Sequence, residues 1–237
     1  MAVSFAVAED ALGRPESSWR RRALDRLPVM SWGPPGRAVV VAPHPDDEVL
    51  GVGGTMAVLV ARGWSVEIVA VSDGEGSHPH LPPAEVAAAR HAEVREALHR
   101  LGLGRLTVHR LGLPDGGGGG LWDGRLAPGL GELLDGADLC LSTWRGDGHP
   151  DHESAGEAAA AVCGRLGVRL VEYPVWAWHW DDPADPVLPL GTACRTALGA
   201  ATHAAKLDAV RAFPSQAGIL PERVLDRFRR PFEVLLP

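Results

Sequence analysis

The chain has 237 residues, of which 46% are hydrophobic, so it is long enough to bury the core of one large α/β domain. Its formal net charge of −7 at pH 7 disfavours nucleic acid and anionic membrane surfaces as partners. Three widely spaced cysteines form no C-x-x-C pair, which argues against a disulfide framework and against a thiolate metal site.

The first 36 residues are interpreted as an N-terminal leader that packs on the remaining domain. Ser17 or Ser18 can cap a short helix over residues 18–27, and the WGPPG segment then ends this helix. Acidic residues interrupt the apolar stretch at the amino terminus, which is too short for a signal peptide, and no later run reaches the length of a membrane span. These features predict a cytoplasmic protein without a membrane partner and leave homo-oligomerisation open.

From residue 37 onward, strand and helix patterns alternate, which is typical of a mostly parallel sheet. β-branched and apolar runs predict strands at 37–42, 65–72, 105–111, 137–143, 168–176 and 231–236. Helical periodicity and glycine stops predict helices at 48–63, 83–102, 153–167 and 201–213. The glycines of the first of these helices are expected to let it pack closely on the sheet.

Two clusters of polar residues come directly after predicted strands. PHPDDE (43–48) follows the strand at 37–42, and GDGHPDH (146–152) follows the strand at 137–143. Because the carboxyl ends of parallel strands lie at one edge of the sheet, the two clusters can face one another across a single crevice. Catalytic zinc needs three nitrogen or oxygen ligands and leaves a fourth position for water. The clusters contain such ligands and candidates for a general base and an oxyanion donor.

The segments APHPDDEVLGVGG and GHPDHESAG resemble the two motifs of the PIG-L/LmbE family of zinc-dependent de-N-acetylases. Weaker similarity extends over most of the chain from about residue 37. The resemblance implies a Rossmann-like, three-layer α/β/α fold with a mostly parallel sheet, in which residues 37–237 form a single LmbE-like domain. It also implies that zinc is bound by His44, Asp47 and His152.

The same resemblance implies catalytic roles for three further residues. Asp46 would be the general base that takes a proton from the attacking water. His149 would be a protonated donor to the oxyanion, and Asp151 would orient its ring. Family members often use a tyrosine two residues before the first histidine of the second motif to polarise the carbonyl. This sequence has Asp147 at that position, and its only tyrosine is Tyr173.

Candidate substrate contacts are Arg90, Asp115, Trp176, Trp178 and His179. Trp176, Trp178 and Trp180 alternate along the chain, so their indoles share one face if the predicted strand continues through them. They could line a substrate site or belong to the core, and the sequence favours neither. The pentaglycine run at 116–120 is interpreted as an active-site lid or a tolerated insertion, and the insertion is favoured.

The sequence therefore predicts a metal-dependent N-deacetylase. It would remove an acetyl or other acyl group from a small N-acylated amino sugar or glycoconjugate. Two alternatives remain: an amidase of thiol conjugates or glycosylated natural products in the same family, and a non-catalytic, metal-bearing sugar-binding protein. Histidine and carboxylate ligands suit iron, cobalt or manganese as well as zinc.

Overall fold

The computed structural model describes residues 13–217, 219–220 and 222–237, so the beginning of the expected leader lies outside the described residues. The helices and strands in chain order are α1 (Glu16–Trp19), β1 (Arg37–Ala42), α2 (Asp47–Ala61), β2 (Ser65–Ala70), α3 (Pro83–Arg100), β3 (Thr107–Arg110), α4 (Leu126–Leu134), β4 (Leu139–Thr143), α5 (Pro150–Leu166), β5 (Arg169–Tyr173), α6 (Ala177–Trp180), β6 (Cys194–Ala197), α7 (Ala200–Val210), α8 (Glu222–Leu225) and β7 (Phe232–Leu235). Short 3₁₀ turns lie at Arg20–Arg22, Leu24–Arg26, Pro214–Gln216 and Asp226–Arg229.

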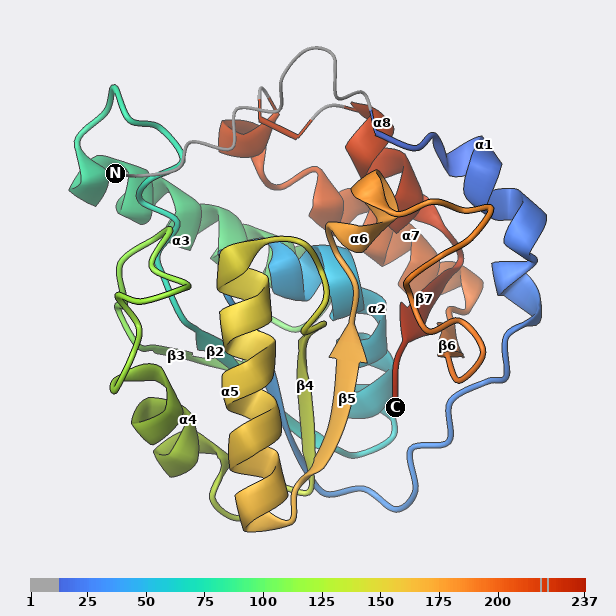
Figure 1. Ribbon diagram of the computed structural model, residues 1–237, viewed down its shortest axis with the longest axis horizontal. Helices are drawn as coiled ribbons and strands as arrows, with labels where there is room; N and C mark the ends of the chain where they lie inside the picture. Colours follow the sequence, from blue (N-terminus) through green and yellow to red (C-terminus); the bar gives the residue numbers. More distant parts are fainter. Residues whose placement is uncertain (1–12, 218, 221) are drawn as a thin grey trace.

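The central sheet contains five parallel strands in the order β3-β2-β1-β4-β5 (Figure 1). The chain runs outward from β1 through β2 to β3 and then returns to the other side of β1 for β4 and β5. The direction of winding therefore reverses between β1 and β4. Ligands of open α/β sheets bind at such a switch point, outside the carboxyl ends of the strands.

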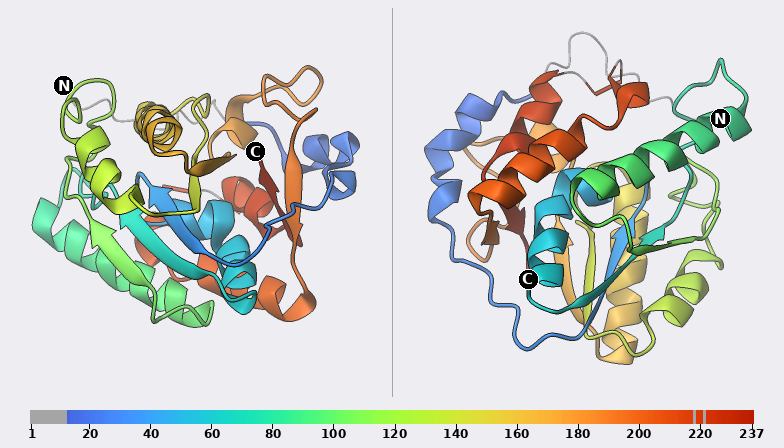
Figure 2. Two further views of the ribbon diagram at one scale, coloured as in Figure 1. Left: turned by 90° about the horizontal axis from the view of Figure 1, so that it is seen from below. Right: turned by 180° about the vertical axis from the view of Figure 1, so that it is seen from behind.

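Helices cover both faces of this sheet. The helices α4 and α5 lie on one face, whereas α2, α3 and α7 lie on the other (Figure 2). In β1, Val39 and Val41 belong to the apolar cluster under α4 and α5, whereas Ala38 and Val40 belong to the cluster under α2 and α3. This alternation follows from the two-residue period of a strand. The predicted three-layer α/β/α fold is confirmed.

The helix that follows β1 packs closely on the sheet. A Cβ atom on Gly51 would lie 2.2 Å from the ring of the buried Tyr173 on β5, so a larger residue would push the helix away. The helix is broken at Val52 (φ −138°, ψ 19°), and the carboxylate of Glu233 accepts hydrogen bonds from two backbone amides beyond the break at 2.8 and 2.6 Å. The close packing expected from the glycines is confirmed.

Some elements differ from the sequence prediction. Helix α4 was not expected, because Pro128 and glycines interrupt its pattern, but its three leucines at four-residue spacing are buried. Strand β7 does not extend the central sheet. It pairs antiparallel with β6, another unexpected element, in a separate two-stranded sheet. The helix expected over 18–27 is one short helix and two 3₁₀ turns separated at Ala23, where φ is 50°.

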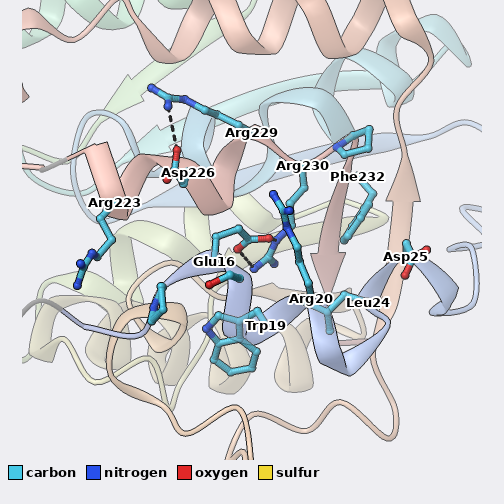
Figure 3. A pocket seen from close by; sticks show the side chains of 13 residues that line it. Glu16, Trp19, Arg20, Leu24, Asp25, Arg223, Asp226, Arg229, Arg230 and Phe232 are labelled. Atoms are coloured by element: carbon cyan, nitrogen blue, oxygen red, sulfur yellow. Dashed lines mark hydrogen bonds and ion pairs between the residues drawn. The ribbon is translucent and has the colours of Figure 1, made fainter.

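The described part of the N-terminal segment packs against the C-terminal part of the chain. Trp19 is fully buried, and its Nε1 donates to the backbone oxygen of Trp178 at 2.9 Å. Glu16 accepts two hydrogen bonds from Arg230, at 2.8 and 2.6 Å. A cavity of about 810 Å³ lies between these two segments (Figure 3), and none of its lining residues belongs to either polar motif. Among the described residues, no helix combines the length and the apolar character that crossing a membrane requires.

Candidate metal centre

The two polar motifs meet at the switch point of the sheet. The first connects β1 to α2, and the second leads from β4 into α5, with β1 and β4 paired as neighbours. Pro150 occupies the first turn of α5, where its fixed φ favours a helix start. At the other motif, Asp46 has φ 141°, a value that residues with a side chain rarely adopt. Strain of this kind is common at functional sites.

Three side-chain atoms form a nearly equilateral triangle between the motifs. Asp47 Oδ2 lies 3.3 Å from His44 Nδ1 and 3.2 Å from His152 Nε2. The two histidine nitrogens are 3.3 Å apart. Ligands bound about 2.0–2.1 Å from a tetrahedral ion are about 3.3 Å apart, so these atoms fit a divalent cation of the size of zinc. The structure thus brings together the three residues that the resemblance implies as metal ligands.

Each histidine of this triangle has a carboxylate on its other ring nitrogen. His152 Nδ1 lies 2.7 Å from Asp147 Oδ2, and both side chains are fully buried. His44 Nε2 lies 2.9 Å from Asp151 Oδ2 and 3.2 Å from Asp115 Oδ1. Metal-binding histidines usually donate in this way to a carboxylate, which fixes the ring orientation and the tautomer. Asp115, expected at the substrate, is therefore placed against a candidate metal ligand.

Sequence reasoning missed the position of Asp147. Its carboxylate also accepts hydrogen bonds from the backbone amides of Val175, Trp176 and Ala177 at 3.0, 2.8 and 2.9 Å. At the position where the resemblance implies a tyrosine hydroxyl, this chain has a carboxylate that lies 2.7 Å from His152 Nδ1. The available signal was an acidic residue in the loop directly after a strand, five positions before that histidine.

The charges of the triangle favour a cation. Burial would lower the pKa of His44, but hydrogen bonds with Asp115, Asp151 and Asp47 raise it well above its usual value. Burial likewise opposes protonation of His152, but the carboxylates of Asp47 and Asp147 raise its pKa to about 9. The ring of His152 is therefore protonated at neutral pH in the absence of a metal, and a divalent cation can replace that proton.

Asp46 lies beside the triangle and is 6% exposed. Burial raises its pKa to about 7, while the positive charge of Arg90 lowers it and the negative charge of Asp47 raises it. Arg90 Nη2 donates to Asp46 Oδ2 at 3.0 Å, and the guanidinium also donates to the backbone oxygens of Pro45 and Gly74. The side chain of Arg90 is buried and engaged by these groups, so the geometry does not support the expected substrate contact.

The ring of His149 differs from the protonated donor that the resemblance implies. Burial and the positive charges of His152 and His44 lower its pKa to about 3, so the ring is neutral at pH 7. Its Nδ1 accepts a hydrogen bond from the backbone amide of Asp151 at 3.2 Å, which places the ring proton on Nε2. The carboxylate of Asp151 is hydrogen-bonded to His44 instead. Asp151 therefore orients His149 through its backbone amide.

The tryptophan segment does not continue the strand, so the expected shared face of three indoles is wrong. Strand β5 ends at Tyr173. The carboxylate of Asp147 then accepts hydrogen bonds from the backbone amides of Val175 and Ala177, where the chain enters α6. Trp178 is 3% exposed and packs edge-on against Trp19 in the core. Trp180 is 42% exposed.

Trp176 remains at the site. Its ring stacks on that of His149, with centroids 6.3 Å apart and planes at 26°. His179 is 9% exposed and packs edge-on against Trp176, with centroids 5.8 Å apart. Of the candidate contacts in this segment, Trp176 stacks on His149 and His179 packs on Trp176, whereas Trp178 belongs to the core.

Comparison with known proteins identifies the family of the chain. The sequence profile of the PIG-L family, described as GlcNAc-PI de-N-acetylase, matches residues 39–163, which is just over half of the chain. The 1D-myo-inositol 2-acetamido-2-deoxy-alpha-D-glucopyranoside deacetylase of Geodermatophilus obscurus is 37% identical over 82 residues. This match covers 35% of the chain and 28% of the relative, so the chain matches less than a third of the relative's length.

Two solved structures share the fold over most of the chain. The conserved protein TT1542 from Thermus thermophilus is 31% identical, with a TM-score of 0.60 and coverage of 80% of this chain and 84% of that one. A zinc-inhibited form of teicoplanin deacetylase is 20% identical, with a TM-score of 0.59 and coverage of 81% and 90%. At this lower identity, the likeness concerns the fold alone. The family profile, the 31% identical structure and the two motifs together show that the chain belongs to the PIG-L family.

Proposed function

We propose that this protein is a zinc-dependent deacetylase that removes the N-acetyl group from a small amino sugar or glycoconjugate. The observation that carries the proposal is the triangle of His44 Nδ1, Asp47 Oδ2 and His152 Nε2, with sides of 3.2–3.3 Å, beside the buried carboxylate of Asp46. Membership of the PIG-L family supports the reaction class. The named activity of the Geodermatophilus relative supports an N-acetylated sugar as the substrate.

The metal would be held by the triangle and would supply Lewis acidity, which lowers the pKa of water and polarises an amide carbonyl. Asp46 then takes the proton from the attacking water. Its pKa of about 7 suits this task, because about half of the carboxyl groups are ionised at pH 7 and the ionised form is still basic. Arg90 holds the carboxylate in place through its 3.0 Å hydrogen bond. The proton on Asp46 can afterwards pass to the departing amine, which needs it to leave as a neutral molecule.

His149 stabilises the negative charge that develops on the carbonyl oxygen. A neutral imidazole with its proton on Nε2 can donate this hydrogen bond, and its Nδ1 contact with the Asp151 amide keeps that tautomer. Trp176 stacks on the same ring and keeps its plane fixed. We also infer that Trp176 forms an apolar wall for the sugar ring next to the reacting amide.

The test is acetate release by the purified chain after removal of bound metal and reloading with zinc, iron, cobalt or manganese. Substrates should include N-acetylated sugars, N-acetylglucosaminyl inositol, acylated glycopeptides and thiol conjugates, and metal content should be measured in parallel. We expect about one metal ion per chain and release from an N-acetyl sugar, both lost in His152→Ala. Sugar binding without release from any compound, with every metal, would instead support the non-catalytic alternative.

A further inference from the structure

The pentaglycine run contacts the metal centre through backbone amides. The run, here called the glycine loop (Gly116–Gly120), lies against the start of α5. The amide of Gly116 donates to Asp151 Oδ2 at 2.9 Å, and the amide of Gly118 donates to Asp151 Oδ1 at 2.7 Å. A third amide, that of Gly119, donates to Ser154 Oγ at 3.0 Å. Asp151 itself is 1% exposed, so these amides replace water around its carboxylate.

The approach of the loop to α5 is too close for any side chain at its centre. A Cβ atom on Gly118 would lie 2.5 Å from the backbone oxygen of Pro150 and 2.7 Å from Asp151 Cα. Both are backbone atoms, so the contact cannot be relieved by rotating a side chain. By contrast, a Cβ on Gly120 would meet nothing within 4 Å. Glycine at position 118 is thus a steric requirement of this contact.

The carboxylate held by the loop also holds a candidate metal ligand. Asp151 Oδ2 lies 2.9 Å from His44 Nε2, on the ring edge opposite the nitrogen that faces the triangle. A continuous series of hydrogen bonds therefore connects the loop, Asp151 and His44.

We propose that the glycine loop is a positioning element of the metal centre, in which its amides clamp Asp151 and thereby orient the ring of His44. The loop is then neither a lid that must open nor an insertion without a role. The inference rests on the proposed metal site but not on the identity of the substrate. Loss of such a supporting partner typically weakens metal binding about 10- to 100-fold, which is the effect expected here.

The direct test compares Gly118→Ala with Gly120→Ala. Both replace a loop glycine, but only the first places a Cβ against α5, whereas the second adds backbone strain alone because Gly120 has φ 154°. We expect Gly118→Ala to raise the zinc Kd, measured by competition with a chromophoric chelator, about 10- to 100-fold. It should also change the visible absorption of the cobalt-substituted protein. Gly120→Ala should leave the Kd and the spectrum close to wild type.

Asp151→Asn provides the second arm of the test. If the loop acts through Asp151, adding Gly118→Ala to Asp151→Asn should cause little further loss of metal affinity, because the two changes break the same connection. Should Gly118→Ala fail to fold, amide hydrogen exchange of residues 116–120 can be compared in the wild type and Asp151→Asn. The clamp predicts slow exchange in the wild type and faster exchange in the variant.

Several outcomes would overturn the clamp. These are a folded Gly118→Ala protein with wild-type zinc Kd, additive losses in the double variant, or loop amides that exchange freely in the wild type. An increase in KM without a change in metal Kd, for both alanine variants, would instead identify a lid. A wild-type chain that binds no metal would overturn the proposed function itself, so the two failures are distinguishable.

Discussion

The two histidines of the candidate metal centre are supported in different ways. The partner of His152 is Asp147, only five residues earlier in the chain, in the loop that leads into α5. The partners of His44 are Asp151, 107 residues away and part of the other motif, and Asp115, which belongs to neither motif. The second motif thus orients its own ligand, whereas the first depends on the second. This difference indicates that the first ligand is oriented only once β1 and β4 have paired and the motifs have met.

The largest expected effect distinguishes the residue that we propose as the general base from the residues that we propose as metal ligands. Asp46→Asn should lower kcat about 10²- to 10⁴-fold, because it removes the base but none of the atoms in the triangle. Steady-state kinetics and metal analysis on the same preparation check this. The exposed Asp123→Asn is the matched control and should behave as wild type. A variant with full activity would remove Asp46 as the base, and one without metal would make it a ligand.

Proton competition at His152 should produce the next largest effect. Its pKa is raised to about 9, so the ring is protonated at pH 7 and must lose that proton before it binds a metal. The apparent zinc affinity should therefore rise at least about tenfold for each pH unit between 7 and 9, and more steeply where His44 must also lose a proton. Calorimetric titrations in buffers of different ionisation enthalpy will count the released protons. An affinity independent of pH would show that neither histidine is a ligand.

Asp147→Asn and Asp151→Asn test the contrast between the two histidines. The first removes the carboxylate that contacts His152 from nearby in the chain, and the second removes the distant carboxylate that contacts His44. Each should raise the metal Kd about 10- to 100-fold. Asp147→Asn should also lower the free energy of unfolding of the metal-free protein by about 1–3 kcal/mol, and by more than Asp151→Asn does, because three amides at residues 175–177 lose their charged acceptor, whereas Asp151→Asn affects the two amides of Gly116 and Gly118. Thermal unfolding measures the difference. Equal losses of stability in the two variants would contradict the comparison.

Removal of the aromatic neighbour of His149 should have the smallest effect. Trp176→Ala should raise KM about 2- to 10-fold, since an aromatic stack contributes about 0.5–1.5 kcal/mol beyond its burial. Trp176→Phe keeps a ring on His149 and should recover most of this loss. Unchanged kinetics in the alanine variant would assign Trp176 to packing and remove it from the substrate wall.

The sequence alone determined the α/β fold, most strands of the sheet and the location of the polar motifs. Apolar runs and helical periodicity are local patterns, and the polar segments PHPDDE (43–48) and GDGHPDH (146–152) follow the strands at 37–42 and 137–143. The rule that the carboxyl ends of parallel strands share one edge then places both motifs at a common crevice. The ligand types follow from the residues themselves, since histidine and carboxylate next to one another favour a divalent cation.

Only the tertiary structure decided which hydrogen-bond partner each side chain of the site has. The pairing of Asp151 with His44, the capture of the 175–177 amides by Asp147 and the burial of Arg90 against Asp46 all join residues far apart in the chain. Sequence spacing predicts which residues reach the same edge of the sheet, but not the direction in which each side chain points once there. That direction depends on steric packing, such as the backbone contact that only glycine permits at position 118.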